Sequence, residues 1–145
     1  MRRLLPLLLC AAITARASAQ LHPEDSLAVV QTVTRFHAAL EVGDTTVLRG
    51  MLAPGAVILK RGEVTPLRGD GLQAEIRWAR AVKRGPAQIT ARVLGWGAFV
   101  YSSASVEAKA NPALIQGTEV ESVVLSRLGR TWFIELIHTS LGSTN

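Results

Sequence analysis

The chain has 145 residues, of which 48% are hydrophobic and 19% charged, a balance typical of a folded globular protein rather than a disordered one. Its 16 basic and 11 acidic residues give a formal net charge of +5, but three of the basic residues lie in the first 19 positions. Without them, thirteen basic residues face eleven acidic ones, a net charge of about +2. So small a charge argues against nucleic acid as a partner.

The first 19 residues have the pattern of a secretory signal peptide. Two arginines precede an apolar run, Leu4–Ile13, and small residues then predict cleavage after Ala19. The run is about half as long as the roughly 20 residues that a membrane-spanning helix needs. We therefore expect residues 20–145 to form one exported domain, periplasmic or extracellular, with no membrane segment. The single cysteine, Cys10, would leave with the signal peptide; its lipidation is the alternative, disfavoured by the bulky Leu9 before it.

Three helices are predicted in the N-terminal half of the exported domain. Apolar residues recur at helical spacing over Pro23–Val42, and Gly43 can end that helix in a left-handed conformation. Asp44 is placed to cap a short helix over Thr45–Leu52. A third helix is expected over Leu72–Lys83, between two glycine-containing breaks.

The rest of the chain is predicted to be extended. Gly129 indicates a tight hairpin between the last two strands, and Gly95 and Gly97 indicate a bulge or bend that curls the sheet. Helices followed mostly by consecutive strands favour an α+β class with a mostly antiparallel sheet. We expect a cone-shaped half-barrel, with the three helices packed over it and an apolar pocket enclosed. The predicted strands are Ala56–Leu59, Glu63–Leu67, Gln88–Leu94, Ala98–Lys109, Thr118–Ser126 and Thr131–Ser140.

Three stretches together carry a resemblance to a known family. They are RFHAALEVGD at residues 35–44, MLAPGAV at residues 51–57, and the segments ESVVL, GRTWFI and HTS within residues 121–140. Their order and spacing resemble the nuclear transport factor 2-like superfamily, in particular its SnoaL-like branch, with a ketosteroid isomerase-like fold. The resemblance spans essentially the whole exported domain. It implies the fold far better than an activity, because members include isomerases, dehydratases, epoxide hydrolases, polyketide cyclases and proteins that only bind a ligand.

The chain differs from the catalytic members of that family at positions where those members carry functional residues. Ketosteroid isomerases carry a tyrosine where this sequence has Phe36 and an aspartate base where it has Lys60. A phenyl ring cannot donate a hydrogen bond, and a protonated lysine cannot accept a proton. Many SnoaL-like proteins have two histidines near the end of the last strand; here Leu136 takes the first place and only His138 remains.

The last hairpin gives the candidate site. A turn with an even number of residues would pair Ser126 with Thr131, and would then place Glu121 opposite Leu136 and Glu119 opposite His138, all on one sheet face. A carboxylate beside an imidazole raises the pKa of the histidine and can form a general acid/base pair; the alternative is a purely structural ion pair. A one-residue change would move this set to the other face. The apolar floor beside it would comprise Val123, Leu125, Trp132, Ile134 and Leu136.

Other side chains complete the set of candidates. The three tryptophans, Trp78, Trp96 and Trp132, and also Phe36 are aromatic candidates for lining an apolar pocket, and ordinary core packing is the favoured alternative for each tryptophan. Tyr101, the sole tyrosine, is a candidate ligand contact as a donor to a ligand oxygen. Arg84, directly after the third predicted helix, continues a stripe that Arg77 and Arg80 form on it; such a stripe is usually a solvated face and otherwise a site for an anionic partner. The three histidines are far apart in sequence and no nucleotide-binding motif is present, so we expect no metal and no cofactor.

We therefore expect an exported, cofactor-free domain that binds a small, largely apolar molecule between sheet and helices. One alternative is a cofactor-independent isomerase, lyase or hydrolase that uses His138 with Glu119 or Glu121. Another is an interaction module that forms a homodimer through its open sheet face, as relatives in the resembled family often do. The sequence leaves these three open.

Overall fold

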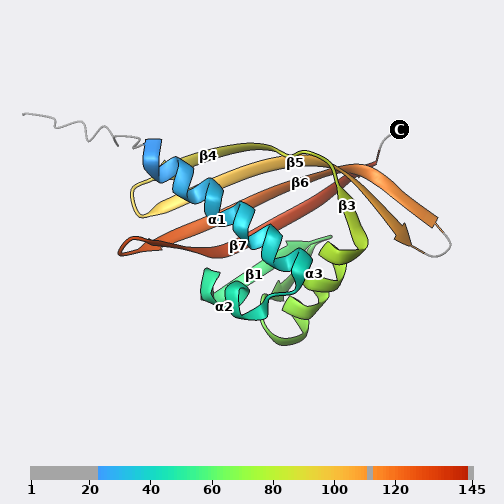
Figure 1. Cartoon of the computed structure of the whole chain (residues 1–145), viewed down its shortest axis with the longest axis horizontal. Helices are drawn as coiled ribbons and strands as arrows, with labels where there is room; N and C mark the ends of the chain where they lie inside the picture. Colours follow the sequence, from blue (N-terminus) through green and yellow to red (C-terminus); the bar gives the residue numbers. More distant parts are fainter. Residues whose placement is uncertain (1–22, 111–112, 144–145) are drawn as a thin grey trace, which may run out of the picture.

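The structure, a computed structural model, describes residues 23–110 and 113–143. Three helices lie against one face of a curled seven-stranded sheet (Figure 1). The helices are α1 (Pro23–Val42), α2 (Thr45–Met51) and α3 (Gly69–Ala81). The strands are β1 (Leu52–Lys60), β2 (Glu63–Pro66), β3 (Val82–Arg84), β4 (Gln88–Leu94), β5 (Gly97–Ala110), β6 (Ala113–Leu128) and β7 (Thr131–Ser143). The predicted signal peptide, with Cys10, lies outside the described residues, and none of the described helices is long and apolar enough to span a membrane.

The first two helices form where the sequence predicts them. α1 buries Val29, Val33 and Phe36 against the sheet, and Gly43 then adopts a φ of 75° that ends the helix. The Asp44 side chain accepts a hydrogen bond from the backbone N–H of Val47 at 3.0 Å, which satisfies one of the free donors at the start of α2.

The third helix starts and ends earlier than predicted. It begins at Gly69 and stops at Ala81, and residues 82–84 form the short strand β3, which pairs with residues 106–108 of β5. The prediction of helix as far as Lys83 is therefore wrong. This difference matters for Arg84. The predicted helical stripe would place its side chain in solvent, but Arg84 belongs to a strand at the edge of the sheet.

The sheet is antiparallel except for one pair of strands. Its order is β2-β1-β7-β6-β5-β3, with β4 pairing beside β3 on β5, and only β1 and β7 run parallel. The α+β class and the mostly antiparallel, curled sheet are confirmed. Gly95 belongs not to a bulge but to the two-residue turn between β4 and β5, so Trp96 stands at the tip of a hairpin.

The register of the last hairpin differs from the predicted one. The turn has only two residues, so that Leu128 pairs with Thr131, and Glu135 is left over as a bulge between the pairs Leu125–Ile134 and Val124–Leu136. One extra residue reverses the face to which every later side chain of β7 points. His138 consequently pairs with Ser122 and not with Glu119, and the predicted register is wrong.

The bulge also explains where the residues of the predicted apolar floor lie. Trp132 and Ile134, which precede the bulge on β7, are buried with Val123 and Leu125 of β6 in one hydrophobic core that includes Phe36 and Leu40 of α1. Leu136, just after it, lies on the opposite, outer face of the sheet. This part of the inner face is therefore packed, and a cavity lies beyond it, around residues 119 and 121 of β6.

Candidate functional site

Two glutamates point from β6 into the interior. Glu119, Glu121 and Val123 occupy every second position of β6 and therefore share its inner face. The relative exposures of the two glutamates are only 5% and 6%. Their neighbour Thr139, opposite Glu121 on β7, is buried too. Because a buried carboxylate is costly without a partner, the groups that face these two side chains define the site.

His37 of α1 is the partner of Glu121. Its Nε2 lies 2.8 Å from Oε1 of Glu121, and its side chain is 24% exposed. Burial by itself would lower the pKa of His37, but the hydrogen bond and the negative charge of Glu121 outweigh it, so that the pKa is raised above its ordinary value. Arg84 opposes this rise and Glu119 supports it.

Arg84 of β3 is the partner of Glu119. Its Nε and Nη2 donate to Oε1 of Glu119 at 2.9 and 2.7 Å, a charge-assisted pair with both side chains largely removed from water. The indole Nε1 of Trp78 reaches the other carboxylate oxygen at 3.5 Å. Within the described residues, no buried side-chain nitrogen or oxygen lacks a hydrogen-bond partner.

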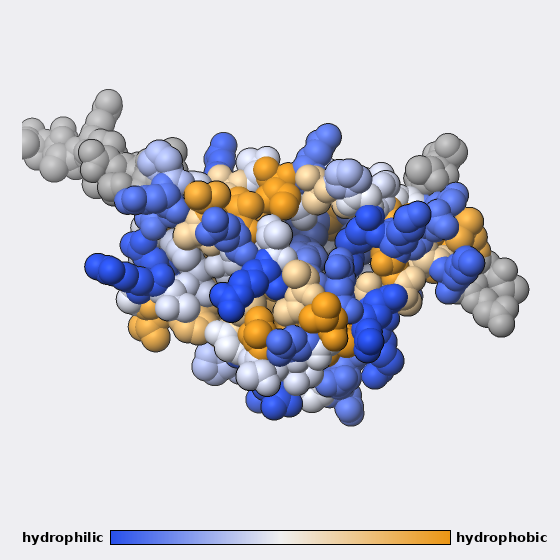
Figure 2. All heavy atoms as spheres, in the orientation of Figure 1, coloured by the Kyte–Doolittle hydropathy of each residue, from blue (hydrophilic) through white to orange (hydrophobic). Residues whose placement is uncertain are grey.

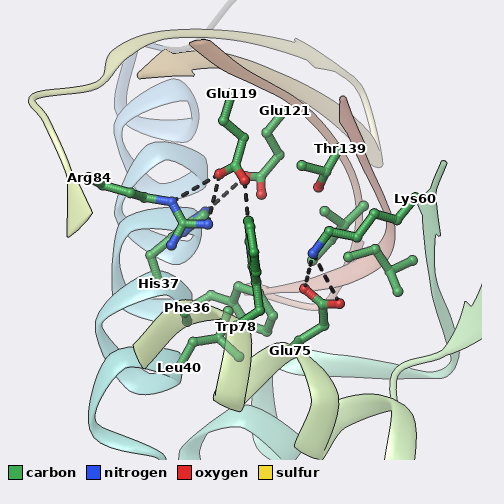
Figure 3. A pocket seen from close by; sticks show the side chains of 13 residues that line it. Phe36, His37, Leu40, Lys60, Glu75, Trp78, Arg84, Glu119, Glu121 and Thr139 are labelled. Carbon is green, nitrogen blue, oxygen red and sulfur yellow. Dashed lines mark hydrogen bonds and ion pairs between the residues drawn. The ribbon is translucent and has the colours of Figure 1, made fainter. Parts of the chain in front are cut away.

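A third pair lies on the far side of Trp78. Lys60, from the end of β1, bonds Glu75 of α3 at 3.1 Å, and its Nζ lies 4.7 Å from the centre of the Trp78 ring. Figure 3 shows the indole standing upright, with its upper end toward Glu119 and Glu121, Arg84 and His37 on one side of it, and Lys60 with Glu75 on the other.

Three spaces follow one another around this cluster. The α1 cavity, between α1 and strands β3–β5, has a volume of about 310 Å³ and includes His37, Arg84, Glu119 and Glu121 in its lining. The neck, beside Trp78, is only about 10 Å³, too small for more than one water molecule. The β7 groove, about 470 Å³, lies beyond it and is lined by Lys60, Arg61, Gly62, Trp78, Ile115, Glu119 and residues 138–141.

Most of the site residues predicted from sequence are not together. His138 is exposed, on the sheet face opposite to Glu119 and Glu121, and of the three spaces described above it borders the β7 groove. Trp96 is 76% exposed at its turn, and Tyr101 is 44% exposed on the outer sheet face. Phe36 is buried and does line the neck. Trp132, Ile134 and Val123 lie in the core and Leu136 on the outer face, as described above.

Two residues that complete the site, His37 and Arg84, were not placed beside the glutamates by sequence analysis. His37 had one visible signal, its place beside Phe36 on the apolar stripe of the first helix, but nothing local pairs it with a residue 84 positions away. Arg84 was missed because the third helix was predicted to continue to Lys83, whereas residues 82–84 form a strand. No group of three histidine, aspartate, glutamate or cysteine side chains within residues 23–110 and 113–143 is arranged to hold a metal ion.

Comparison with known proteins supports the fold. No family model and no curated sequence matches the chain. Among solved structures, a candidate ketosteroid isomerase from Shewanella frigidimarina superposes with a TM-score of 0.68 at 24% identity, covering 78% of this chain and 94% of that one. A candidate dehydratase of the NTF2-like family from Streptomyces avermitilis gives 0.67 at 18% identity, covering 83% and 98%. The chain has the nuclear transport factor 2-like fold.

The NTF2-like fold is shared by proteins of different kinds. The CaMKII hub homology domain of Chlamydomonas reinhardtii also superposes, with a TM-score of 0.63 at 17% identity, covering 82% of this chain and 99% of that one. At such identities the likeness defines the architecture and not the activity. The fold implied by the three sequence stretches is thus confirmed, and the function has to be argued from the site.

Proposed function

We propose that this NTF2-like domain binds a small, largely apolar molecule with one polar group in the α1 cavity. The observation that carries the proposal is the convergence of the His37–Glu121 and Arg84–Glu119 pairs at one end of a cavity about 310 Å³ in volume. Cavities that bind small molecules have this character, with mainly apolar walls and a few convergent polar groups.

The polar groups indicate which part of a ligand they would hold. A guanidinium has five N–H donors, and Glu119 occupies only two of those of Arg84. Arg84 and His37 each already face a carboxylate. A neutral oxygen acceptor, such as a carbonyl or hydroxyl, therefore fits better than a second anion. Val33, Ile89 and Ala104 supply apolar wall for the rest of the molecule.

The same geometry favours acid–base catalysis as a second candidate function. Glu121 raises the proton affinity of His37, so the imidazole is placed to give a proton to a bound oxygen and to recover it, as a cofactor-independent isomerase, lyase or hydrolase requires. In this form of the proposal His37 replaces His138 as the acid–base residue. Turnover that is abolished in His37→Gln while ligand binding persists would distinguish catalysis from binding alone.

We propose in addition that the domain works after export and as a homodimer. The support for export is the pattern of residues 1–19, and N-terminal sequencing of the secreted protein tests it. The support for a dimer is a group of partly exposed apolar side chains on the outer sheet face, where Phe99 pairs with Val124 and Tyr101 is their neighbour.

Binding in the α1 cavity can be tested by filling it. Ala104 faces the cavity from β5, whereas the next residue back, Ser103, faces the other side of the sheet. With methyl heptyl ketone as the probe, we expect Ala104→Trp to weaken binding more than tenfold, measured by calorimetric titration, and Ser103→Trp to leave it unchanged. A wild-type domain that binds neither this ketone nor the matching alcohol would overturn the proposal.

A further inference from the structure

We infer, resting on the proposed function, that Trp78 is a specificity-determining residue: it restricts the α1 cavity to ligands whose oxygen lies at or near one end of the molecule. The inference comes from the arrangement of the three spaces around the polar cluster. The α1 cavity lies on one side of that cluster and the β7 groove on the other, and the neck shares lining residues with both.

The neck belongs to both neighbouring spaces. It shares His37, Arg84 and both glutamates with the α1 cavity, and it shares Lys60, Trp78, Glu119 and Thr139 with the β7 groove. A ligand oxygen held by Arg84 or His37 therefore sits where the two spaces would join. Any part of the ligand beyond that oxygen would have to enter the neck, which has room for about one water molecule.

Trp78 closes this passage as a fixed group. Its indole nitrogen faces Glu119, and the ammonium of Lys60 lies over its ring, itself held by Glu75 (Figure 3). Its neighbours on α3, Ile76 and Ala79, are buried, so the helix that carries it is anchored in the core. A ring held from both sides cannot turn aside without breaking these contacts.

The space behind Trp78 is suited to an apolar group. The β7 groove has apolar wall from Ile115 and Leu141, in addition to the Trp78 ring itself. Shortening Trp78 would join the groove to the α1 cavity and leave the oxygen-binding groups in the middle of one longer space. Ligands with apolar arms on both sides of their oxygen would then fit.

Two isomeric ketones test this directly. Methyl heptyl ketone carries its oxygen near one end and dibutyl ketone carries it in the middle, while composition and apolar content are the same. Each methylene excluded from an apolar site costs about 0.8 kcal/mol, or roughly fourfold in affinity. By calorimetric titration we expect the wild-type domain to bind methyl heptyl ketone at least about tenfold tighter, and Trp78→Ala to bind the two within about twofold of each other.

Control variants separate the closure of the neck by Trp78 from other effects of the substitution. Trp78→Phe keeps a ring in the neck and is expected to keep the preference, and Leu141→Ala enlarges the β7 groove without opening the neck and is expected to keep it too. Should Trp78→Ala fail to fold by circular dichroism, Trp78→Leu serves, with a partial loss of preference expected.

The outcomes also separate this inference from the proposed function. A wild-type domain that binds neither ketone contradicts both. A wild-type domain that binds both ketones alike, or a folded Trp78→Ala variant that retains the full preference, overturns the role of Trp78 and leaves ligand binding in the α1 cavity standing.

Discussion

The contact between His37 and Glu121 joins a half-buried imidazole to a buried carboxylate. Each would be costly alone inside the cone, and each is accepted because the other is within hydrogen-bonding distance. Because the pKa of His37 is raised, the folded protein binds a proton at this histidine more tightly than the unfolded chain does. The pair therefore links folding to pH.

The sign of this pH dependence follows from the direction of the shift. A group with a higher pKa in the folded state stabilises the fold fully below its unfolded pKa, which for histidine is about 6.5, and loses that contribution as pH rises through the folded pKa. We expect the free energy of unfolding, from urea titrations at a series of pH values, to fall as pH rises above about 6.5. His37→Gln should remove this part of the slope, and an unchanged slope in that variant would refute the assignment.

At the scale of elements, α3 is held to the sheet by an unusually close approach of backbone. A Cβ on Gly71, in the first turn of α3, would lie 2.2 Å from the carbonyl oxygen of Pro66 at the end of β2 and 2.8 Å from Cγ2 of Thr65. Only glycine fits there. The contact sets the position of α3 and therefore of Trp78 and Glu75, which the helix carries into the site.

Two glycine substitutions distinguish this contact from helix propensity. Gly71→Ala forces backbone apart, and we expect it to lower the free energy of unfolding by about 1–3 kcal/mol. Gly50→Ala, within α2 and with nothing inside 4 Å of the added carbon, should raise it by about 0.5–1 kcal/mol because alanine is the better helix former. Chemical denaturation measures both, and equal effects of the two changes would contradict the role given to Gly71.

For the whole molecule, the question is what covers the outer face of the sheet. On the face seen in Figure 2, apolar side chains are interspersed with hydrophilic ones over the helices and strand edges and do not form one broad patch. The outer sheet face is different in kind, because Phe99, Tyr101 and Val124 are each about 40% exposed there and are neighbours across paired strands.

A charge placed in that group tests the proposed dimer. Val124→Lys would put an ammonium at the centre of the shared face, and we expect it to convert a dimer to a monomer in analytical ultracentrifugation without loss of secondary structure. Val64→Lys, on β2 and also exposed, is the matched change away from the face and should leave the dimer intact. A wild-type protein that sediments as a monomer at all concentrations would refute the dimer.

The amino-acid sequence by itself determined the α+β class, the first two helices with their glycine stop and aspartate cap, and the last hairpin. It also placed two glutamates on the inner face of β6, because alternation along a strand is a local property. Only the tertiary structure decided which histidine they meet. The bulge at Glu135 leaves no local signature, yet it turns His138 outward. α1 places His37 beside Glu121, 84 positions away in the sequence. Because α3 ends early, Arg84 lies on a strand and pairs with Glu119. Periodicity describes neighbours along the chain, and the candidate site is made by residues that become neighbours only when the sheet curls.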